Sequence, residues 1–277
     1  MKKTIEVTDI VLTLNYQFER FFTSQIDAYQ TSKKPDYSIS CEIVDSLTMP
    51  NDTPAKTTAT QRLFKNAQGQ TLYAFYHGKL AHRIHLSVDK KHYTISLSKQ
   101  AYDNLDEVEY VLTGMVFFDL AYRHEVIALH ASAVVYNDTV TLLSAPSGTG
   151  KTTLAKRVLK KYQDAFILND DKPLLYKKDT HIYITGSPWS GSEGINQNKQ
   201  YPLNRIIFLK QGMTNKIDEM HTTEKVIELM RNLYRPKTIN QLDIVEPLLD
   251  YLLKNIDIVR YYCLNDDTAI DSIKMYF

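Results

Sequence analysis

Short runs of alternating apolar and polar residues dominate the N-terminal third of the chain. In one of them, Ile84, Leu86 and Val88 alternate with His85 and Ser87. This two-residue period is typical of a strand with one buried face, and turn-forming residues separate the runs. The pattern predicts strands over residues 5–14, 37–44, 61–65, 71–76, 81–88 and 93–97. The N-terminal part is therefore expected to be rich in β structure.

The apolar residues change to a helical spacing over residues 103–124. Val108, Leu112 and Met115 recur three and four positions apart, and acidic residues stand in the first turn, where the helix dipole favours them. We expect this helix to close the first part of the chain, with a domain boundary near residue 125. Residues 1–125 would then form a β-rich α+β domain that ends in a helix.

Strands and helices alternate from residue 127 onward. Strands are expected over residues 128–136, 139–144, 165–169, 174–178, 181–185, 205–210 and 258–264. Helices are expected over residues 150–162, 223–234 and 242–256. Strands that alternate with helices predict an α/β core for residues 126–277.

Composition narrows the classes of function. The 277 residues carry a net charge of +1, which favours neither a nucleic acid nor a membrane surface as the partner. Cys41 and Cys263 are far apart in the sequence, as expected for reduced thiols. The basic N-terminus lacks the apolar run of a signal peptide, and no stretch is long enough to cross a membrane. We expect a cytoplasmic protein and leave open whether it is a homo-oligomer.

The most informative stretch follows the predicted strand over residues 139–144. It reads Ala145-Pro146-Ser147-Gly148-Thr149-Gly150-Lys151-Thr152 and leads into the next helix. A glycine-rich turn between a strand and a helix is the context of a phosphate-binding P-loop, in which backbone N–H groups hold phosphates. The usual first glycine is here Ala145, which fits where the backbone needs no positive φ. The alternative is an ordinary glycine turn that happens to precede a lysine.

The P-loop interpretation gives these residues roles. Lys151 would reach the terminal phosphates of a nucleotide, and the Thr152 hydroxyl would bind Mg²⁺. The predicted nucleotide-binding residues are Ser147, Gly148, Thr149, Gly150, Lys151, Thr152 and Thr153. A nucleotide and Mg²⁺ are therefore the expected ligands.

A predicted hairpin brings a histidine to this turn. If residues 137–138 form a two-residue turn, Tyr136 pairs with Thr139, and counting back along both strands places His130 opposite Ala145. Histidine can carry a charge or a proton near neutral pH. His130 is therefore a candidate catalytic residue, and the alternative is a hydrogen-bonded histidine of a strand.

A second predicted hairpin has its turn at residues 179–180. This turn pairs Lys178 with His181 and places Asp171 opposite Pro188, provided that no bulge shifts the register. The loop that contains Pro188 is thus expected beside the acidic residues that end the preceding strand.

Those acidic residues are Asp170 and Asp171, at the carboxyl end of the predicted strand over residues 165–169. Ligands of parallel α/β sheets bind at this end. One carboxylate can hold Mg²⁺, and the other can accept a proton from an attacking hydroxyl. The alternative is a capped turn at the end of a strand.

The loop over residues 186–196 contains three glycines, a proline and the only tryptophan, Trp189. Such a composition is too polar and too rich in glycine for a buried element. We expect a mobile loop that covers the site or contacts the acceptor, with Trp189 moving when a ligand binds. The alternative is a surface loop with Trp189 packed on the core.

Four segments together resemble a known family. They read Leu129-His130-Ala131-Ser132-Ala133, Ser147-Gly148-Thr149-Gly150-Lys151-Thr152, Asp170-Asp171 and Gly186-Ser187-Pro188-Trp189-Ser190-Gly191. In these segments, residues 127–212 resemble the bacterial HPr kinase/phosphorylase-like group, which shares its nucleotide-binding core with phosphoenolpyruvate carboxykinases. The resemblance implies an α/β P-loop core of that type, with ATP and Mg²⁺ as cofactors. It also implies that His130, Lys151, Asp170 and Asp171 take part in phosphoryl transfer.

The chain departs from the family pattern after the second hairpin. The HPr enzymes carry a Glu-x-Arg-Gly signature there, whereas this loop is similar to that of divergent HPr-kinase-like proteins found with peptide-modification gene sets. Glu193 is the nearby candidate for the metal-binding glutamate, beside Thr152 and Asp171. The resemblance thus implies transfer of the γ-phosphoryl group of ATP to a hydroxyl, on a serine of a peptide or protein. The alternatives are a small-molecule kinase, a carboxykinase-like enzyme and a non-catalytic nucleotide-binding sensor.

Overall fold

A computed structural model describes residues 1–146, 148–191, 194–234, 239–264 and 266–276. The chain divides into two compact units, Met1–Phe117 and Phe118–Phe277, which we describe one at a time. The division falls inside helix α2 (Leu105–Tyr122), ahead of the boundary expected near residue 125. The described helices include none that is long and apolar enough to cross a membrane.

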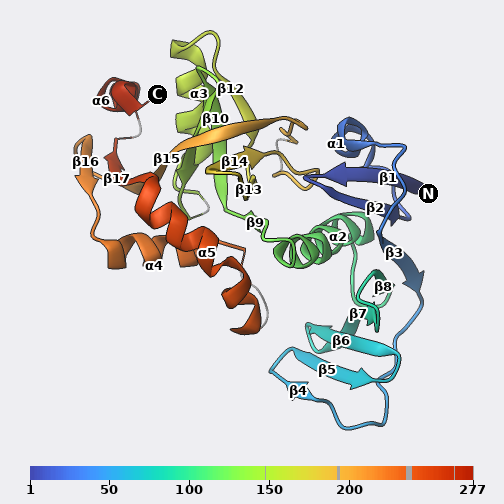
Figure 1. Cartoon of the computed structure of the whole chain (residues 1–277). Helices are drawn as coiled ribbons and strands as arrows, with labels where there is room; N and C mark the ends of the chain where they lie inside the picture. The colour runs from blue at the N-terminus through green and yellow to red at the C-terminus, as the bar shows by residue number, and fades with distance from the viewer. Residues whose placement is uncertain (147, 192–193, 235–238, 265, 277) are drawn as a thin grey trace. The chain divides into compact units, whose positions relative to one another are not determined.

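The first unit is built on a mixed sheet, with eight strands among the described residues (Figure 1). In spatial order the strands are β1 (Lys2–Val7), β2 (Ile10–Asn15), β3 (Tyr37–Val44), β8 (His92–Ser98), β7 (Lys79–Ser87), β6 (Gly69–Tyr76), β5 (Gln61–Asn66) and β4 (Lys56–Thr57). Strands β2, β3 and β8 run parallel to one another. Two short helical segments, α1 (Thr23–Ile26) and η1 (Asp27–Tyr29), connect β2 to β3.

The single strand predicted over residues 5–14 is wrong. The structure has a hairpin there, in which Val7 of β1 pairs with Ile10 of β2. Thr8 takes a φ of 50° in the turn. A β-branched residue rarely adopts this conformation, so the sequence carried no turn signal at Thr8.

The second unit contains a curled, half-barrel sheet. Its main path of described strands is β12 (Phe166–Asn169), β10 (Ala131–Tyr136), β11 (Thr139–Ser144), β15 (Gln200–Gln211), β14 (His181–Thr185), β13 (Leu174–Lys178) and β9 (Ile127–Ala128). Strand β17 (Asp257–Cys263) pairs with β15 and with β16 (Lys216–Glu219).

Strand β15 joins the two halves of this sheet. Its first residues, from Gln200 to Pro202, pair antiparallel with β14. From Leu203 onward it pairs with β11 and then also with β17, both in parallel. Because β15 takes part in both pairings, the sheet curls. The carboxyl ends of the parallel strands β11, β15 and β17 lie at one edge of the sheet.

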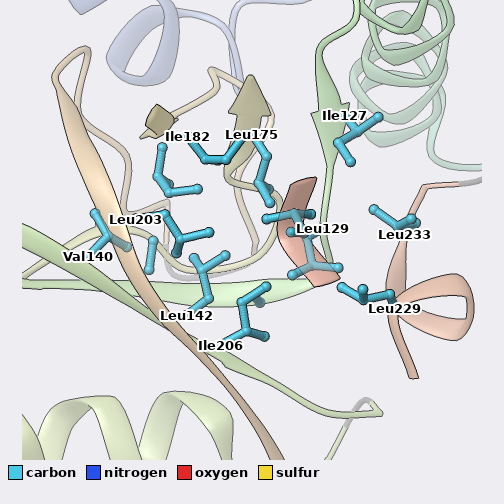
Figure 2. Close-up of a cluster of buried hydrophobic side chains, with 14 of the residues drawn as sticks. Ile127, Leu129, Val140, Leu142, Leu175, Ile182, Leu203, Ile206, Leu229 and Leu233 are labelled. Carbon is cyan, nitrogen blue, oxygen red and sulfur yellow. The ribbon is translucent and has the colours of Figure 1, made fainter. Parts of the chain in front are cut away.

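Alternate residues of the central strands enter two different cores. Leu142 and Ile206 belong to the first core, which Figure 2 shows, and Leu143 and Ile207 belong to the second. Leu229 of helix α4 (Thr222–Asn232) packs into the first core, together with residues of α5 (Ile239–Asn255). Helices α3 (Lys151–Lys161) and α6 (Thr268–Ile273) supply the second core, and η2 (Lys274–Tyr276) follows α6. Both faces of the sheet are therefore buried, as parallel strands require.

Two features differ from the expected α/β alternation. Among the described residues, both units are β-rich sheets with few helices. The strand predicted over residues 128–136 is broken into β9 and β10, and His130 lies in the break. There the His130 N–H donates to the carbonyl of Asn232 at 2.8 Å. The end of α4 thus takes the hydrogen bond that a continuous strand would have made.

Candidate active site

The glycine-rich turn lies between the end of β11 and the start of α3. Gly148 and Gly150 have φ values of 78° and 108°, a conformation that side chains disfavour. An added Cβ would meet nothing within 4 Å at either glycine, so the backbone angle and not the space calls for glycine. In the part of the chain that the structure describes, Ala145 is not among the residues with positive φ. Alanine at the position of the usual first glycine therefore causes no strain.

Helix α3 begins with its first N–H groups uncapped by a side chain. Gly150 is the N-cap residue and makes no side-chain cap hydrogen bond. The first turn carries Lys151, Thr152 and Thr153 and has no acidic residue. Such a helix start combines free backbone donors with the positive end of the helix dipole. It suits an anion better than it suits a neutral ligand.

Lys151 points back toward the end of β11 and the break before β10. The side chain is buried, and its Nζ lies 2.8 Å from both the Ala145 carbonyl and His130 Nε2. Burial lowers the pKa of Lys151, and the nearby charge of Asp171 partly offsets this effect. An ammonium group has only donors to offer, so Nε2 of His130 is the acceptor.

His130 continues this chain of contacts to Asp171. Its Nδ1 lies 2.8 Å from Oδ1 of Asp171. Because Nε2 accepts from Lys151, the proton of the neutral ring is assigned to Nδ1, which donates to the carboxylate. The His130 carbonyl also accepts from Ser144 Oγ at 2.9 Å. The ring is thus held between a cation and an anion in one tautomer.

Asp171 is the anionic end of the cluster. Burial raises its pKa, but the hydrogen bond from His130 and the charge of Lys172 outweigh burial and lower the pKa to about 2. Lys172 forms an ion pair with Asp171. The carboxylate therefore stays ionised across the range in which enzymes work.

Asp170 occupies a different environment one residue earlier. It is buried, with Oδ1 accepting from the Gly191 N–H at 3.0 Å. A Cβ at Gly191 would come within 3.1 Å of the Asp171 Cβ and 3.4 Å of both Asp170 carboxylate oxygens. A side chain at this position would therefore require its neighbours to shift slightly, which glycine avoids.

Asn169 holds the acidic turn and was missed by the sequence reasoning. Its Oδ1 accepts from the N–H groups of Asp171 and Lys172, at 3.0 and 2.8 Å, and its Nδ2 donates to the Ser187 carbonyl at 3.2 Å. The signal was present, since asparagine at the end of a strand commonly caps the next N–H groups. Fully buried Asn169 thereby joins the strand end to the following loop.

The expectation of an exposed loop from residue 186 is wrong for residues 186–190. All five are buried, and Trp189 is only 3% exposed, with its ring edge on Phe118. Ser187 Oγ donates to the Lys172 carbonyl at 3.0 Å, which supplies one of the polar contacts inside this stretch. A polar segment can be buried when its hydrogen bonds are satisfied internally. These residues form a packed wall beside the two aspartates.

The structure brings most of the predicted residues together. Lys151, His130 and Asp171 are in contact, and Asp170 adjoins them. Both hairpin registers are confirmed, with Ala131 opposite Ser144 and Leu174 opposite Thr185. The remaining nucleotide-binding candidates follow on the turn and the first turn of α3, namely Gly148, Thr149, Gly150, Thr152 and Thr153. Ser147 and Glu193 lie outside the described residues.

A metal ion would depend on oxygen donors beyond the protein side chains. Within the described ranges, no group of three or more His, Cys, Asp or Glu residues is placed to hold one. Mg²⁺ keeps several waters and is commonly bound by one or two carboxylates plus substrate phosphates. Asp171, which stays ionised, and the Thr152 hydroxyl fit that pattern, because phosphate oxygens would complete the set.

Comparisons with known proteins give little further information. No protein-family model matches the chain, and a search of the curated proteins finds no match. One solved structure that resembles it is the HPr(Ser) kinase/phosphatase from Coxiella burnetii, at 13% sequence identity and a TM-score of 0.26. The match covers 46% of this chain and 97% of the other. A likeness this weak carries no argument about activity, so the functional case depends on the residues themselves.

Proposed function

We propose that the chain is an ATP-dependent phosphotransferase that moves the γ-phosphoryl group to a hydroxyl, on a serine of a peptide or protein. The observation that carries this proposal is the chain of contacts from Lys151 through His130 to Asp171, beside the glycine-rich turn. Burying charged groups costs free energy unless they are paired. Their concentration at the edge where three parallel strands end is characteristic of a catalytic site.

The turn would act as the phosphate-binding loop. Its backbone N–H groups and the uncapped start of α3 supply donors for phosphate oxygens. Lys151 would exchange its contact with His130 for the terminal phosphates. Burial lowers the pKa of Lys151, and a bound phosphate would favour its charged form.

The two aspartates would divide the remaining work. Asp171 suits the binding of Mg²⁺, together with the Thr152 hydroxyl, because its low pKa makes it a poor proton acceptor. Asp170 would accept the proton of the attacking hydroxyl, and the Gly191 N–H orients its carboxylate. Bound Mg²⁺ would neutralise negative charge on the phosphates. His130 would hold Lys151 and Asp171 in place and keep their charges apart.

The choice of a serine hydroxyl as the acceptor follows from the resemblance of the four sequence segments to HPr-kinase-like proteins. A small-molecule kinase or a carboxykinase-like enzyme would use the same phosphate site. A nucleotide-binding sensor would bind ATP with the same residues but without consuming it. Measuring turnover therefore separates the sensor from the enzymes, and the labelled product separates the enzymes from one another.

The deciding experiment uses γ-labelled ATP with a cell lysate as the source of acceptors, and measures ATP affinity in parallel. Lys151→Ala should weaken ATP binding and lower transfer roughly 100- to 1,000-fold, as expected for loss of a group that stabilises transferred charge. Lys160→Ala is the matched control, because Lys160 is exposed on the same helix. If Lys151→Ala matched the control in both measurements, the proposed function would be wrong.

A further inference from the structure

The glycine-rich turn has a second side that the proposed chemistry does not use. In the order of the sheet, β10 and β12 lie on one side of β11, whereas β15 and β17 lie on the other. His130 precedes β10 and Asp171 follows β12, so the acidic and basic cluster belongs to the first side. A molecule whose reacting phosphate faces that cluster can extend its other end toward β15 and β17.

A hollow of about 130 Å³ opens on this second side. Its lining includes Gly148, Gly150, Arg157, Gln211, Cys263 and Leu264. The glycines of the turn and the carboxyl ends of β15 and β17 thus line the same hollow. A ligand there would be in direct continuity with phosphates on the turn.

The lining has the mixed character of a small-molecule site. Leu154, Leu264 and the Cys263 thiol supply apolar surface, and Arg157 and Gln211 supply polar groups. Sites for planar organic ligands combine apolar walls with a few polar groups that fix orientation. Arg157 also donates from Nε to Asp267 at 3.1 Å, which anchors its guanidinium group.

A neighbouring hollow of about 330 Å³ shares Gly148, Thr149 and Gln211 with the first. Its cation, Lys210, is already paired with buried Glu228 at 2.9 Å, so this hollow offers no free charge for a second anion. Small-molecule sites typically have volumes of roughly 300 to 1,000 Å³. Together the adjoining hollows provide enough room for a sugar and a base.

We infer that the nucleoside of the bound nucleotide occupies the two adjoining hollows, over the ends of β15 and β17, with Cys263 and Leu264 lining the smaller one. This inference rests on the proposed nucleotide-dependent function. It goes further in fixing the direction of the ligand, with the terminal phosphate toward Lys151 and the base toward Cys263. The ligand class is a nucleoside triphosphate, and inorganic polyphosphate would bind only at the turn.

Cys263 allows a direct test. Its thiol is half-buried, whereas the other cysteine, Cys41, is buried. The full-length protein is treated with a maleimide at mildly alkaline pH, because burial raises the pKa of the Cys263 thiol. The label is assigned by mass spectrometry and by its loss in Cys263→Ser. Binding of ATP and of inorganic tripolyphosphate is measured separately by calorimetry.

The expected result is protection by ATP and none by tripolyphosphate. At about ten times its dissociation constant, ATP should slow labelling of Cys263 roughly tenfold, because only free sites react. If ATP binds but the rate of maleimide labelling of Cys263 does not change, the nucleoside lies elsewhere. The proposed phosphate site would be unaffected by that result. If neither ATP nor tripolyphosphate binds, both the proposed function and this inference are wrong.

A second variant separates occlusion from an indirect effect on the thiol. Leu264→Trp should fill the hollow and weaken ATP binding about tenfold, which corresponds to about 1.4 kcal/mol. Tripolyphosphate should bind this variant as it binds the wild type, which also shows that the turn is intact. Equal loss of affinity for both ligands, or no loss for ATP, would overturn the placement of the nucleoside.

Discussion

Each of the two units holds a carboxylate that is mostly shielded from solvent, and the pKa values of the two shift in opposite directions. In the first unit, Glu109 of α2 is fully buried and accepts from the N–H groups of Gln17 and Phe18 at 2.7 and 2.9 Å. Burial raises its pKa, and these hydrogen bonds only partly offset the effect. In the second unit, Asp171 is surrounded by His130 and Lys172, and its pKa falls to about 2.

The pKa values of Glu109 and Asp171 shift in opposite directions because the groups that contact the two carboxylates differ. Neutral backbone N–H groups offset only part of the free-energy cost of burying the charge of Glu109. The hydrogen bonds of Glu109 connect α2 to the chain after β2. Cationic or ionisable partners keep a carboxylate charged at the cost of burying more charge. Glu109 therefore serves the fold, whereas the cluster around Asp171 fits the catalytic site that we propose. The following experiments test that division.

The largest effect is expected at the two aspartates. Asp170→Asn and Asp171→Asn should each lower phosphoryl transfer about 10²- to 10⁴-fold, the range for loss of a general base or a charged catalytic group. ATP affinity should change much less, because these charges act mainly in the transition state. Steady-state kinetics and calorimetry measure the two quantities, and Asp164→Asn, at an exposed position, is the control. Unchanged turnover in both variants would show that the two aspartates only form a capped turn at the end of the strand.

A smaller loss is expected at His130, which we place as a positioning residue. His130→Ala removes a contact to Lys151 and one to Asp171. Lys151 keeps its contact to the Ala145 carbonyl and Asp171 keeps its ion pair with Lys172. We therefore expect a loss equal to about one hydrogen bond to a charged group, about 1.5–3 kcal/mol, so turnover should fall by roughly ten- to a hundredfold. Added imidazole should restore part of the rate. A rate that does not recover while folding is intact would show that the histidine only supports the strand break.

In the first unit the expected effect is on stability alone. Glu109→Ala leaves the N–H groups of Gln17 and Phe18 without their acceptor, which should lower the free energy of unfolding by about 1–3 kcal/mol. Urea denaturation measures the loss, and Glu107→Ala, exposed on the same helix, is the control. ATP affinity of the folded variant should equal that of the wild type. A changed affinity would contradict the structural role of Glu109.

The smallest and most specific effect is a pH dependence. The pKa of Asp171 is about 2 in the folded state, below its ordinary value of 3.8. The unfolded chain therefore takes up the proton first as the pH falls. The stabilisation is complete above about pH 4, amounts to about 2 kcal/mol, and is lost between about pH 4 and 2. Comparing unfolding of the wild type with Asp171→Asn across this range should show the difference shrinking as the solution becomes more acidic. A constant difference would mean that Asp171 is not stabilised in its charged form.

The sequence by itself determined the local features of this protein. Both hairpin registers, the glycine-rich turn and the start of α3 at Lys151 follow from turn residues and spacing within a few positions. Backbone conformation at such turns depends on neighbouring residues, so it can be predicted without knowing the rest of the fold. From these registers the nearness of His130 to the turn could also be predicted.

Only the tertiary structure decided the features that depend on distant partners. The break at His130 exists because the carbonyl of Asn232, more than 100 residues later, takes its N–H. Trp189 is buried because Ser187 and Asn169 satisfy the polar backbone around it. Composition indicates how polar a segment is, but burial depends on whether its hydrogen bonds can be met by residues that the fold brings near. The same reason separates Glu109 from Asp171, since the partners that set each pKa come from other parts of the chain.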